Sequence, residues 1–445
     1  MDVYQEYKGK CCTADQAVQV VKDGDWVDYG MSCAYPTALD KALARRQGDL
    51  KDIKVRNAIS CHPVAILEAD PENETFTYNL WHCSAIDRKY LDAGRAYHEP
   101  MLFRDCGSYY TRGFAPVNVA MITVAPMDRH GNFSFGLTNG CTQEMLDAAE
   151  TIIIEVNPNM PVVFGMGSDH IHVSKVHAIV ESQEAVSLAP NREPSAIDKQ
   201  IAENIFPYLH DGITLQLGIG GMPNALGILI AESDLKDLGM HTELMSDGYL
   251  NLYKAGKITN DKKPFQRGKG VFSICMGSKE LYEFLDHNQD VLSAPMHYVN
   301  NPETIRQLDD FISINSCIAA DLYGQVCSES AGTRHISGTG GQLDFVTGAY
   351  AADHGKAFLA MPSSRVDKKG IRHSNILPKF TAGDIITTPR TQAPYMVTEY
   401  GVANLSGLAT WQRAEALINI AHPDVREDLI KAAEAQHIWR RSNKC

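Results

Sequence analysis

The chain has 445 residues, enough for two or three domains with substantial cores. Hydrophobic residues make up 44% of it and charged residues 21%, ordinary values for a folded globular protein, so disorder, collagen and coiled coil are excluded as descriptions of the whole chain. With 54 acidic and 41 basic residues the net charge is −13, which disfavours nucleic acid and anionic lipid as main partners.

The N-terminal residues and the cysteines give expectations about the cell compartment. Residues 1–10 lack the apolar core of a secretory signal, and no stretch approaches the length of about 18 apolar residues that a membrane span needs. The 11 cysteines include no C-x-x-C pair. We therefore expect a cytoplasmic protein without a membrane span, whose cysteines stay reduced and mostly fill buried space.

The first elements along the chain form a pattern that returns later. A helical stretch is predicted over residues 14–22, followed by a short strand between Gly24 and Gly30. Pro36 then opens a second helix, a position where proline is favoured because its missing N–H is not needed in the first turn.

The same succession begins again near residue 198. A helix is predicted over residues 198–208, a short strand lies between Gly212 and Gly218, and Pro223 opens a helix that runs to about residue 238. The glycines and prolines of the two passages are 187 to 188 residues apart. A shared spacing of this kind favours an internal duplication.

A second pair of matching segments supports the duplication. Asp128-Arg-His-Gly131 and Asp321-Leu-Tyr-Gly324 each follow an apolar run, and they are 193 residues apart. Further apolar stretches predict strands over residues 121–125, 151–156, 271–275, 311–319, 356–360 and 395–398.

Alternating helices and strands predict open α/β layers of parallel strands with right-handed crossovers. We expect two tandem domains of this kind, related by duplication, over residues 1–195 and 196–445. Pro190 and Pro194 make a boundary near this point plausible, and residues 410–439 are predicted to form terminal helices.

A glycine-rich turn after the strand that ends at Leu217 is the most informative local pattern. Gly218, Gly220 and Gly221 would let backbone N–H groups approach an anionic or carbonyl oxygen. Pro223 stands where a dinucleotide-binding motif needs its third glycine, so that motif is excluded. The alternative is a purely structural strand-to-helix turn. The first copy lacks these glycines, which indicates that the second copy holds the oxygen-binding loop.

The next predicted strand carries an acidic side chain. If it runs parallel to the strand before Gly218, its end lies at the same edge of the sheet, and Glu243 points at or near the crevice there. Two alternatives remain: a ribose-binding acid, or a carboxylate at the rim paired with His241. Glu399, which also follows a predicted strand, is the rival candidate for a catalytic carboxylate.

A second glycine cluster runs from Ser337 to Phe345 and could place N–H donors opposite the first one. Two such loops around a carboxylate would stabilise a tetrahedral oxyanion. A structural turn is again the alternative.

Other polar residues give weaker signals. His170 and His172 have a spacing that a strand could use for metal, but no partner with ligand spacing is evident, so no metal site is predicted. Asp128 beside His130 is interpreted as a turn whose carboxylate accepts local backbone hydrogen bonds. No G-x-S-x-G motif supplies a serine nucleophile.

Taken together, these motifs resemble the acetyl-CoA hydrolase/transferase family, and within it the butyryl-CoA:acetate and 4-hydroxybutyrate CoA-transferases. The resemblance covers nearly the whole chain. It rests on segments 24–30, 126–131, 155–157, 218–225, 243–248, 337–345 and 397–403.

The resemblance implies two domains of the CoA-transferase fold and a set of site residues. Glu243 matches the family's nucleophilic glutamate, which carries CoA as a thioester. Asn375 departs from the pattern, because relatives often have a basic residue there, and this puts in doubt a contact from that position to a CoA phosphate or a substrate carboxylate. The CoA-binding positions of the family match Gly218, Ile219, Gly220, Gly221, Met222, Ile318 and Gly341.

By this resemblance we expect a CoA-transferase that moves CoA from a short-chain acyl-CoA, butyryl-CoA, to acetate by a ping-pong mechanism. Coenzyme A would be substrate and transient adduct, with no tightly bound cofactor, and the protein would form a homo-oligomer, a dimer or a dimer of dimers. Alternatives are 4-hydroxybutyrate or propionate transfer, acyl-CoA hydrolysis, or a non-catalytic sensor of CoA or a nucleotide. Candidates for an acyl pocket, each equally compatible with the core, are Tyr29, Met31, Tyr35 and Trp81.

Overall fold

The computed structural model describes residues 2–189 and 193–443 of the chain. Two compact units make up the fold. The first comprises Met1–Pro190, Glu243–Met245 and Gly270–Val299, and the second comprises Asn191–Thr242, Ser246–Lys269 and Asn300–Cys445. Two segments from the C-terminal half therefore fold with the N-terminal unit, an exchange that sequence analysis did not predict.

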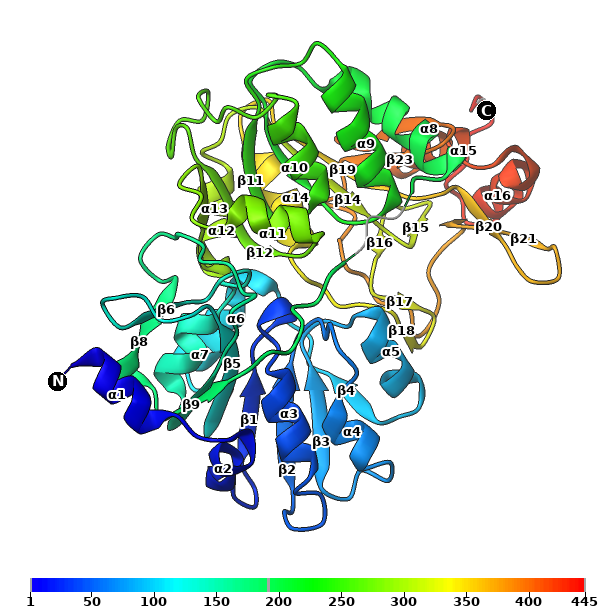
Figure 1. Cartoon of the computed structure of the whole chain (residues 1–445). Helices are drawn as coiled ribbons and strands as arrows, with labels where there is room; N and C mark the ends of the chain where they lie inside the picture. Colours follow the sequence, from blue (N-terminus) through cyan, green and yellow to red (C-terminus); the bar gives the residue numbers. More distant parts are fainter. Residues whose placement is uncertain (1, 190–192, 444–445) are drawn as a thin grey trace. The chain divides into compact units, whose positions relative to one another are not determined.

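A seven-stranded sheet forms the centre of the N-terminal part, beside helices α3, α4 and α5 (Figure 1). Its strand order is β4-β3-β2-β1-β5-β7-β9, and all its neighbouring strands run parallel. The strands are β1 (Trp26–Tyr29), β2 (Ile53–Asn57), β3 (Phe76–Leu80), β4 (Ala96–His98), β5 (Val119–Val124), β7 (Thr151–Val156) and β9 (Ala178–Glu181).

An eight-stranded sheet has the order β13-β12-β11-β10-β14-β19-β23-β24. β10 pairs in parallel with β11 and β14, and β19 pairs in parallel with β14 and β23. The strands are β10 (Thr214–Leu217), β11 (Gly239–Met245), β12 (Gly270–Cys275), β13 (Val291–Ser293), β14 (Phe311–Ser316), β19 (Lys356–Ala360), β23 (Tyr395–Thr398) and β24 (Gly401–Asn404).

The two sheets share one topology. In the first sheet, the strands β1, β2, β3 and β4 follow one another toward one edge, as β10, β11, β12 and β13 do in the second. The later strands of each half then follow in chain order on the other side of β1 and of β10. The glycine after each first strand is held alike: Gly30 N–H donates to Met121 O, and Gly218 N–H donates to Ile314 O. The structure thus gives the duplicated α/β fold that the sequence predicted.

A small turn is repeated with the same hydrogen bonds in both halves. In the first, the Asp128 carboxylate accepts the N–H groups of His130 and Asn132. In the second, the Asp321 carboxylate accepts those of Tyr323 and Gln325. The turn predicted at Asp128 is therefore confirmed, and its copy is the same motif.

The fold also contains four smaller sheets of two or three strands. They are formed by β6 (Asn132–Ser134) with β8 (His170–His172), β15 (Ala319–Asp321) with β16 (Val326–Cys327) and β22 (Ile376–Leu377), β17 (Ser330–Ala331) with β18 (Arg334–His335), and β20 (Ser364–Val366) with β21 (Arg372–Ser374).

The helices connect successive strands and are mostly short. Those up to residue 190 are α1 (Val3–Lys10), α2 (Ala14–Ala17), α3 (Thr37–Ala44), α4 (Ala65–Ala69), α5 (Ala85–Asp92), α6 (Cys106–Thr111) and α7 (Thr142–Ala148). The later ones are α8 (Ala196–Ile205), α9 (Gly221–Glu232), α10 (Asp247–Lys254), α11 (Lys279–Leu285), α12 (Met296–Val299), α13 (Pro302–Ile305), α14 (Gln342–Ala351), α15 (Thr410–Asn419) and α16 (Pro423–Ala435).

Several predicted elements have different limits in the structure. The helix predicted over residues 14–22 ends at Ala17 and continues as a 3₁₀ turn to Val20. The strand predicted over residues 311–319 stops at Ser316. The Cys317 N–H still donates to Ala360 O of the neighbouring strand β19, but the Ile318 N–H turns to Cys327 O of β16, outside the main sheet. The helix predicted to reach residue 238 ends at Glu232, where Ser233 becomes extended. In contrast, the strands predicted over residues 151–156, 356–360 and 395–398 are confirmed at both ends.

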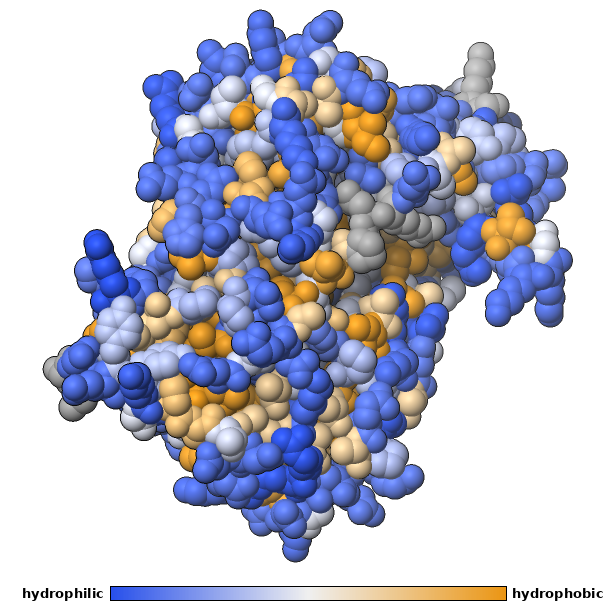
Figure 2. Space-filling model, viewed as in Figure 1, coloured by the Kyte–Doolittle hydropathy of each residue, from blue (hydrophilic) through white to orange (hydrophobic). Residues whose placement is uncertain are grey.

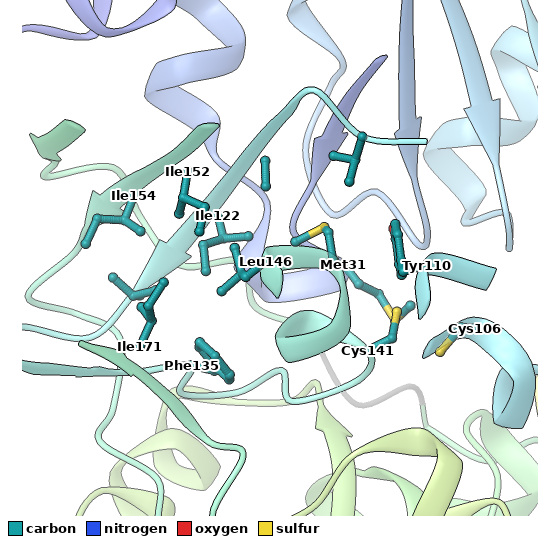
Figure 3. Packing of buried hydrophobic residues seen from close by; sticks show 14 of the residues in the cluster. Met31, Cys106, Tyr110, Ile122, Phe135, Cys141, Leu146, Ile152, Ile154 and Ile171 are labelled. Carbon is teal, nitrogen blue, oxygen red and sulfur yellow. The ribbon is translucent and has the colours of Figure 1, made fainter. Parts of the chain in front are cut away.

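Buried aliphatic and aromatic side chains fill both sides of the first sheet, and Figure 3 shows part of one cluster. The ten described cysteines all carry free thiols and seven are buried, as predicted. The face drawn in Figure 2 is mostly hydrophilic. Among the described helices, none combines the length and apolar character needed to cross a membrane.

Candidate functional site

The first glycine loop joins β10 to α9. Gly220 is the N-cap of α9 and has φ +117°, a conformation that only glycine adopts without strain, and no side chain caps this helix. Ile219 beside it is 57% exposed, whereas Met222 is buried. The loop therefore presents the first N–H groups of a twelve-residue helix, which suit an anionic or carbonyl oxygen.

A polar network fixes the strands on which this loop stands. Gln216 on β10 and Asn315 on β14 exchange two amide hydrogen bonds of 3.1 and 3.0 Å, and Ser313 donates to Gln216 at 2.7 Å. A Cβ on Gly218 would lie 3.5 Å from the Asn315 side chain, so Gly218 packs closely on this network. Sequence reasoning gave Gln216 no role, since its partner lies 99 residues away.

Glu243 lies in the second half of β11 and is half-buried, whereas Thr242 and Leu244 on either side of it are buried. Alternation along a strand places neighbouring side chains on opposite faces, so Glu243 points away from both of them. With Leu244 and Met245 it is grouped with the first compact unit, while the start of β11 belongs to the second.

The rival carboxylate Glu399 has a structural role. One of its oxygens accepts the N–H of Ser363 at 2.8 Å, and the other accepts the Ser363 hydroxyl at 2.6 Å. Both oxygens are thus committed to a clamp between the end of β23 and the loop after β19. This arrangement counts against Glu399 as the reacting carboxylate.

The second glycine loop ends at the start of α14, where Gly341 is the N-cap and no side chain caps the helix. Gly340 has φ +56°. Ser337 is held by two bonds, because its N–H donates to Glu329 O and its hydroxyl donates to Ser328 O at 2.7 Å. Thr339 donates to the Glu329 carboxylate at 3.2 Å. The loop is therefore anchored by residues 328 and 329 in addition to its own turn.

Ile318 and Asn375 lie close to one another in the small sheet of β15, β16 and β22. Ile318 is half-buried just before β15, and Asn375 O accepts the N–H of Ala320 at 3.0 Å. The Asn375 side-chain amide donates to Pro362 O at 2.9 Å. The Asn375 side chain is thus bound to the backbone of a neighbouring loop.

The first unit holds a small cavity of about 20 Å³ at the carboxyl ends of β1 and β2. Met31, Tyr110 and Cys141 contribute to its wall and lie near one another in Figure 3. Three of the four proposed acyl-pocket residues line it, namely Tyr29, Met31 and Trp81. Tyr35 does not, and its hydroxyl instead donates to buried Asp40 at 2.7 Å.

A buried guanidinium forms the polar part of this cavity wall. Arg56 contacts Asp28 at 2.9 Å and Glu99 at 3.1 Å, and its guanidinium lies 4.4 Å from the centre of the Trp26 ring. Burial disfavours the charge, but the two carboxylates outweigh it and raise the pKa of Arg56. The cavity thus has apolar walls and one permanently charged side.

The histidines considered for metal are engaged in local contacts. His172 contacts Ser174 through Nδ1 and His130 O through Nε2, and His170 lies 3.1 Å from the Asp169 carboxylate. The His172 bonds lie at the antiparallel pair of β6 and β8 and at the short turn after β8.

Comparison with known proteins places this geometry in context. Residues 1–190 match the N-terminal domain of the acetyl-CoA hydrolase/transferase family, and residues 277–433 match its C-terminal domain. A butyryl-CoA:acetate CoA-transferase of Anaerostipes caccae is 47% identical over 446 residues, covering 100% of both chains.

Solved structures agree with the sequence comparisons. RipA from Yersinia pestis superposes with a TM-score of 0.91 at 34% identity, covering 98% of this chain and 100% of that one. A 4-hydroxybutyrate CoA-transferase from Porphyromonas gingivalis gives a TM-score of 0.78 at 31% identity, covering 97% and 99%.

Proposed function

The chain belongs to the acetyl-CoA hydrolase/transferase family and is a CoA-transferase, and we propose that it moves CoA from butyryl-CoA to acetate. The observation that carries this proposal is the full-length similarity to a butyryl-CoA:acetate CoA-transferase. The substrates would be an acyl-CoA and a short-chain carboxylate, with CoA as the group transferred. 4-Hydroxybutyrate is the second candidate acid, because a structural relative acts on it.

We assign the nucleophile to Glu243. Its carboxylate attacks the acyl carbonyl of butyryl-CoA. The carbon–sulfur bond breaks, the CoA thiolate departs, and an acyl-glutamyl anhydride forms. The thiolate then attacks the glutamyl carbonyl, the anhydride opens, and butyrate leaves. CoA is now held by Glu243 as a thioester, and acetate reverses the same steps to give acetyl-CoA. A carboxylate suits this task because the thioester's free energy is conserved throughout.

The glycine loops would stabilise the negative charge that develops on the carbonyl oxygen each time a nucleophile adds to it. We assign CoA contacts to Gly218, Ile219, Gly220, Gly221 and Met222, together with Ile318 and Gly341. The N-termini of α9 and α14, which no side chain caps, support an oxyanion-binding role. Removing one such donor costs about 3 kcal/mol of barrier in well-studied enzymes.

We propose the cavity at Met31 as part of the acyl site. Its volume of about 20 Å³ has room for little more than a water molecule, so even a butyryl chain needs the wall to move, and a longer chain needs a larger movement. Met31→Ala enlarges the space, and we expect the ratio of hexanoyl-CoA to butyryl-CoA turnover to rise. A constant ratio across acyl lengths would remove the cavity from the acyl site.

The covalent intermediate gives the decisive test. The protein is incubated with butyryl-CoA alone and then reduced with borohydride, and the peptide containing Glu243 is analysed by mass spectrometry. Reduction of the Glu243 side chain to an alcohol is expected, with none in Glu243→Gln and an undiminished signal in Glu399→Gln. An unmodified peptide from a fully active preparation would contradict the mechanism.

A hydrolase is the nearest rival, since it differs in whether water reaches the anhydride or thioester. We expect butyryl-CoA consumption to depend on added acetate. Full-rate consumption without any acid acceptor would favour the hydrolase. A non-catalytic CoA sensor would bind butyryl-CoA and consume none.

We also propose a cytoplasmic homo-oligomer. Cell fractionation would test the location, and sedimentation would test the oligomeric state.

A further inference from the structure

Tyr249, near the start of α10, is fully buried and reaches the end of β10. Its hydroxyl accepts the N–H of Leu217 at 2.7 Å and donates to Leu215 O at 3.3 Å. These are the last strand residues before Gly218. A side chain from a helix therefore takes part in the hydrogen bonding of the strand that carries the first glycine loop.

The hydroxyl occupies a position where a backbone group of β11 would be expected. The pairing of β10 with β11 covers Thr214 with Gly239 and Leu215 with Met240. Gly218 N–H bonds to β14, so the N–H of Leu217, one residue earlier, faces β11. It is the Tyr249 hydroxyl that accepts this N–H.

The first copy shows the same place without such an insertion. There β1 pairs with β2 through three positions, the last being Asp28 with Arg56. The matching position in the second copy would be one step beyond Leu215 and Met240, where the ladder has already stopped. The two copies therefore differ at the point where Tyr249 enters.

Tyr249 also contacts the middle of β11. It hydrogen-bonds to the side chain of Thr242, the residue before Glu243. α10 is fixed close to α9, since a Cβ on Gly227 would lie 3.6 Å from the Gly248 Cα. Burial raises the pKa of the Tyr249 phenol, so the hydroxyl keeps the proton that it donates to Leu215 O.

We propose that Tyr249 is a positioning residue for CoA transfer, a spacer that sets the separation between Leu217 and Thr242, the residues directly before Gly218 and Glu243. This proposal rests on the proposed function, in which Glu243 and the Gly218 loop act on the same thioester. The phenol hydroxyl bonds to Leu217 at the end of β10 and to Thr242 on β11, so its loss alters the geometry of both groups at once.

The variant Tyr249→Phe removes the hydroxyl and keeps the ring. Tyr90→Phe is the matched control, because Tyr90 is also buried, accepts a backbone N–H from Val64 and donates to Glu68. We expect both variants to lose similar thermal stability. Only Tyr249→Phe should lower kcat for butyryl-CoA and acetate, by about tenfold or more, as misplacement of reacting groups does. Equal kcat in the two variants would overturn the proposal.

A second measurement separates this proposal from the function on which it rests. Hydrogen exchange of the peptide over residues 214–226 should speed up in Tyr249→Phe and stay unchanged in Tyr90→Phe, whatever reaction the enzyme catalyses. Unchanged exchange would contradict the spacer role. Lack of transfer by the native chain, with faster exchange in the variant, would contradict the proposed function alone.

Thr242→Val provides a further variant that keeps the side-chain shape. We expect a smaller fall in kcat than for Tyr249→Phe. The double variant should be little worse than Tyr249→Phe, since both changes break one hydrogen-bonded unit. Fully additive effects would show that Thr242 and Tyr249 act separately, which the proposal does not allow.

Discussion

The loop after β1 and the loop after β10 begin at equivalent glycines but continue differently. After Gly30 the chain makes a 3₁₀ turn in which buried Ser32 has φ +55°, and α3 starts only after Pro36. After Gly218 the chain enters α9 within three residues by way of Gly220. The second route exposes helical N–H groups directly at the strand end, whereas the first covers that end with packed side chains.

The neighbouring strands differ in the same sense. Aligned through their pairing with β1 and β10, Ala58 in the first half stands where Glu243 stands in the second. Ala58 is buried and contributes to the cavity wall beside Met31. The duplication therefore kept the strand frame in both halves. The candidate reactive groups are in one half, and a small cavity lined by Met31, Trp81 and the Arg56 guanidinium lies at the matching place in the other.

Replacing Glu243 should produce the largest effect in this comparison. Glu243→Gln removes the proposed nucleophile, and we expect transferase activity to fall by about a thousandfold or more. Because the side chain is half-buried and the change is isosteric, the thermal midpoint should move little. Steady-state assay of acetyl-CoA formation from butyryl-CoA measures the loss.

Placing a carboxylate at the matching site tests whether the two halves are interchangeable. Ala58→Glu in the Glu243→Gln background should not restore activity, since the loop beside Ala58 is the 3₁₀ turn Ser32–Ala34, whose Ser32 N–H donates to Ala58 O, and this turn lacks the glycines of the Gly218 loop. Recovery of transfer would show that the halves are functionally equivalent.

The repeated aspartate turns should differ in their contribution to stability. Asp321 is fully buried and Asp128 is exposed, although both accept two backbone N–H groups. We expect Asp321→Ala to lower the free energy of unfolding by about 3 kcal/mol and Asp128→Ala by about 1 kcal/mol. Urea unfolding measures both. Equal losses would mean that burial does not strengthen the turn.

Alanine variants of Gly220 and Gly24 separate the loss of stability caused by backbone strain from a loss of catalytic activity. Both have positive φ, and a Cβ on either would meet no atom within 4 Å, so alanine acts through conformation alone. Each alanine variant should lose about 1–2 kcal/mol of stability. Only Gly220→Ala should also lower kcat/KM, by about tenfold. An equal activity loss in Gly24→Ala would remove the special role of the first glycine loop.

The two halves also bury cations in different ways, which predicts a pH dependence. Arg56 is paired with carboxylates, whereas Lys263 bonds to the carbonyls of Met240 and Lys269, and burial lowers its pKa to about 7. Between this value and the pKa of about 10.4 in the unfolded chain, the unfolded state holds the extra proton. Stability should therefore rise with pH there, by at most about 1.4 kcal/mol per unit.

Lys263→Met should flatten that rise, and the exposed control Lys199→Met should leave it unchanged. Urea unfolding at pH 7, 8 and 9 gives the slopes. Below pH 7 both states are protonated, so the contribution of Lys263 is constant there. Parallel slopes for Lys263→Met and the native chain would contradict the assignment.

The sequence predicted most of the sheet framework, because local patterns determine it. Strands such as Thr151–Val156 and Lys356–Ala360 contain short apolar runs, over residues 152–154 and 357–360, that begin directly after a polar residue. The paired glycines and aspartates revealed the duplication, since turns need those residue types. The early end of β14 was missed because it depends on the Ile318 N–H turning to Cys327 O in a separate small sheet, which the apolar pattern of residues 311–319 does not reveal.

Features that join distant segments could not be predicted from local pattern. Glu243 and the glycine loops were recognisable as motifs, and Glu399 was a plausible rival until its bonds to Ser363 were seen. Tyr249 gave no signal, because an aromatic residue on a helix is usually core. The role of its hydroxyl depends on a hydrogen bond from Leu217, which lies 32 residues earlier in the chain.

The assignment of residues 270–299 to the first unit bears on how the protein is made. Cys275 N–H bonds to Leu137 O at 2.8 Å, and the Tyr282 hydroxyl bonds to Ser187 O at 2.7 Å, so this late segment completes an early core. About two thirds of the polypeptide must be synthesised before the first unit has all the segments of its core. Premature termination near residue 190 would leave that half with an open apolar flank for chaperones to shield.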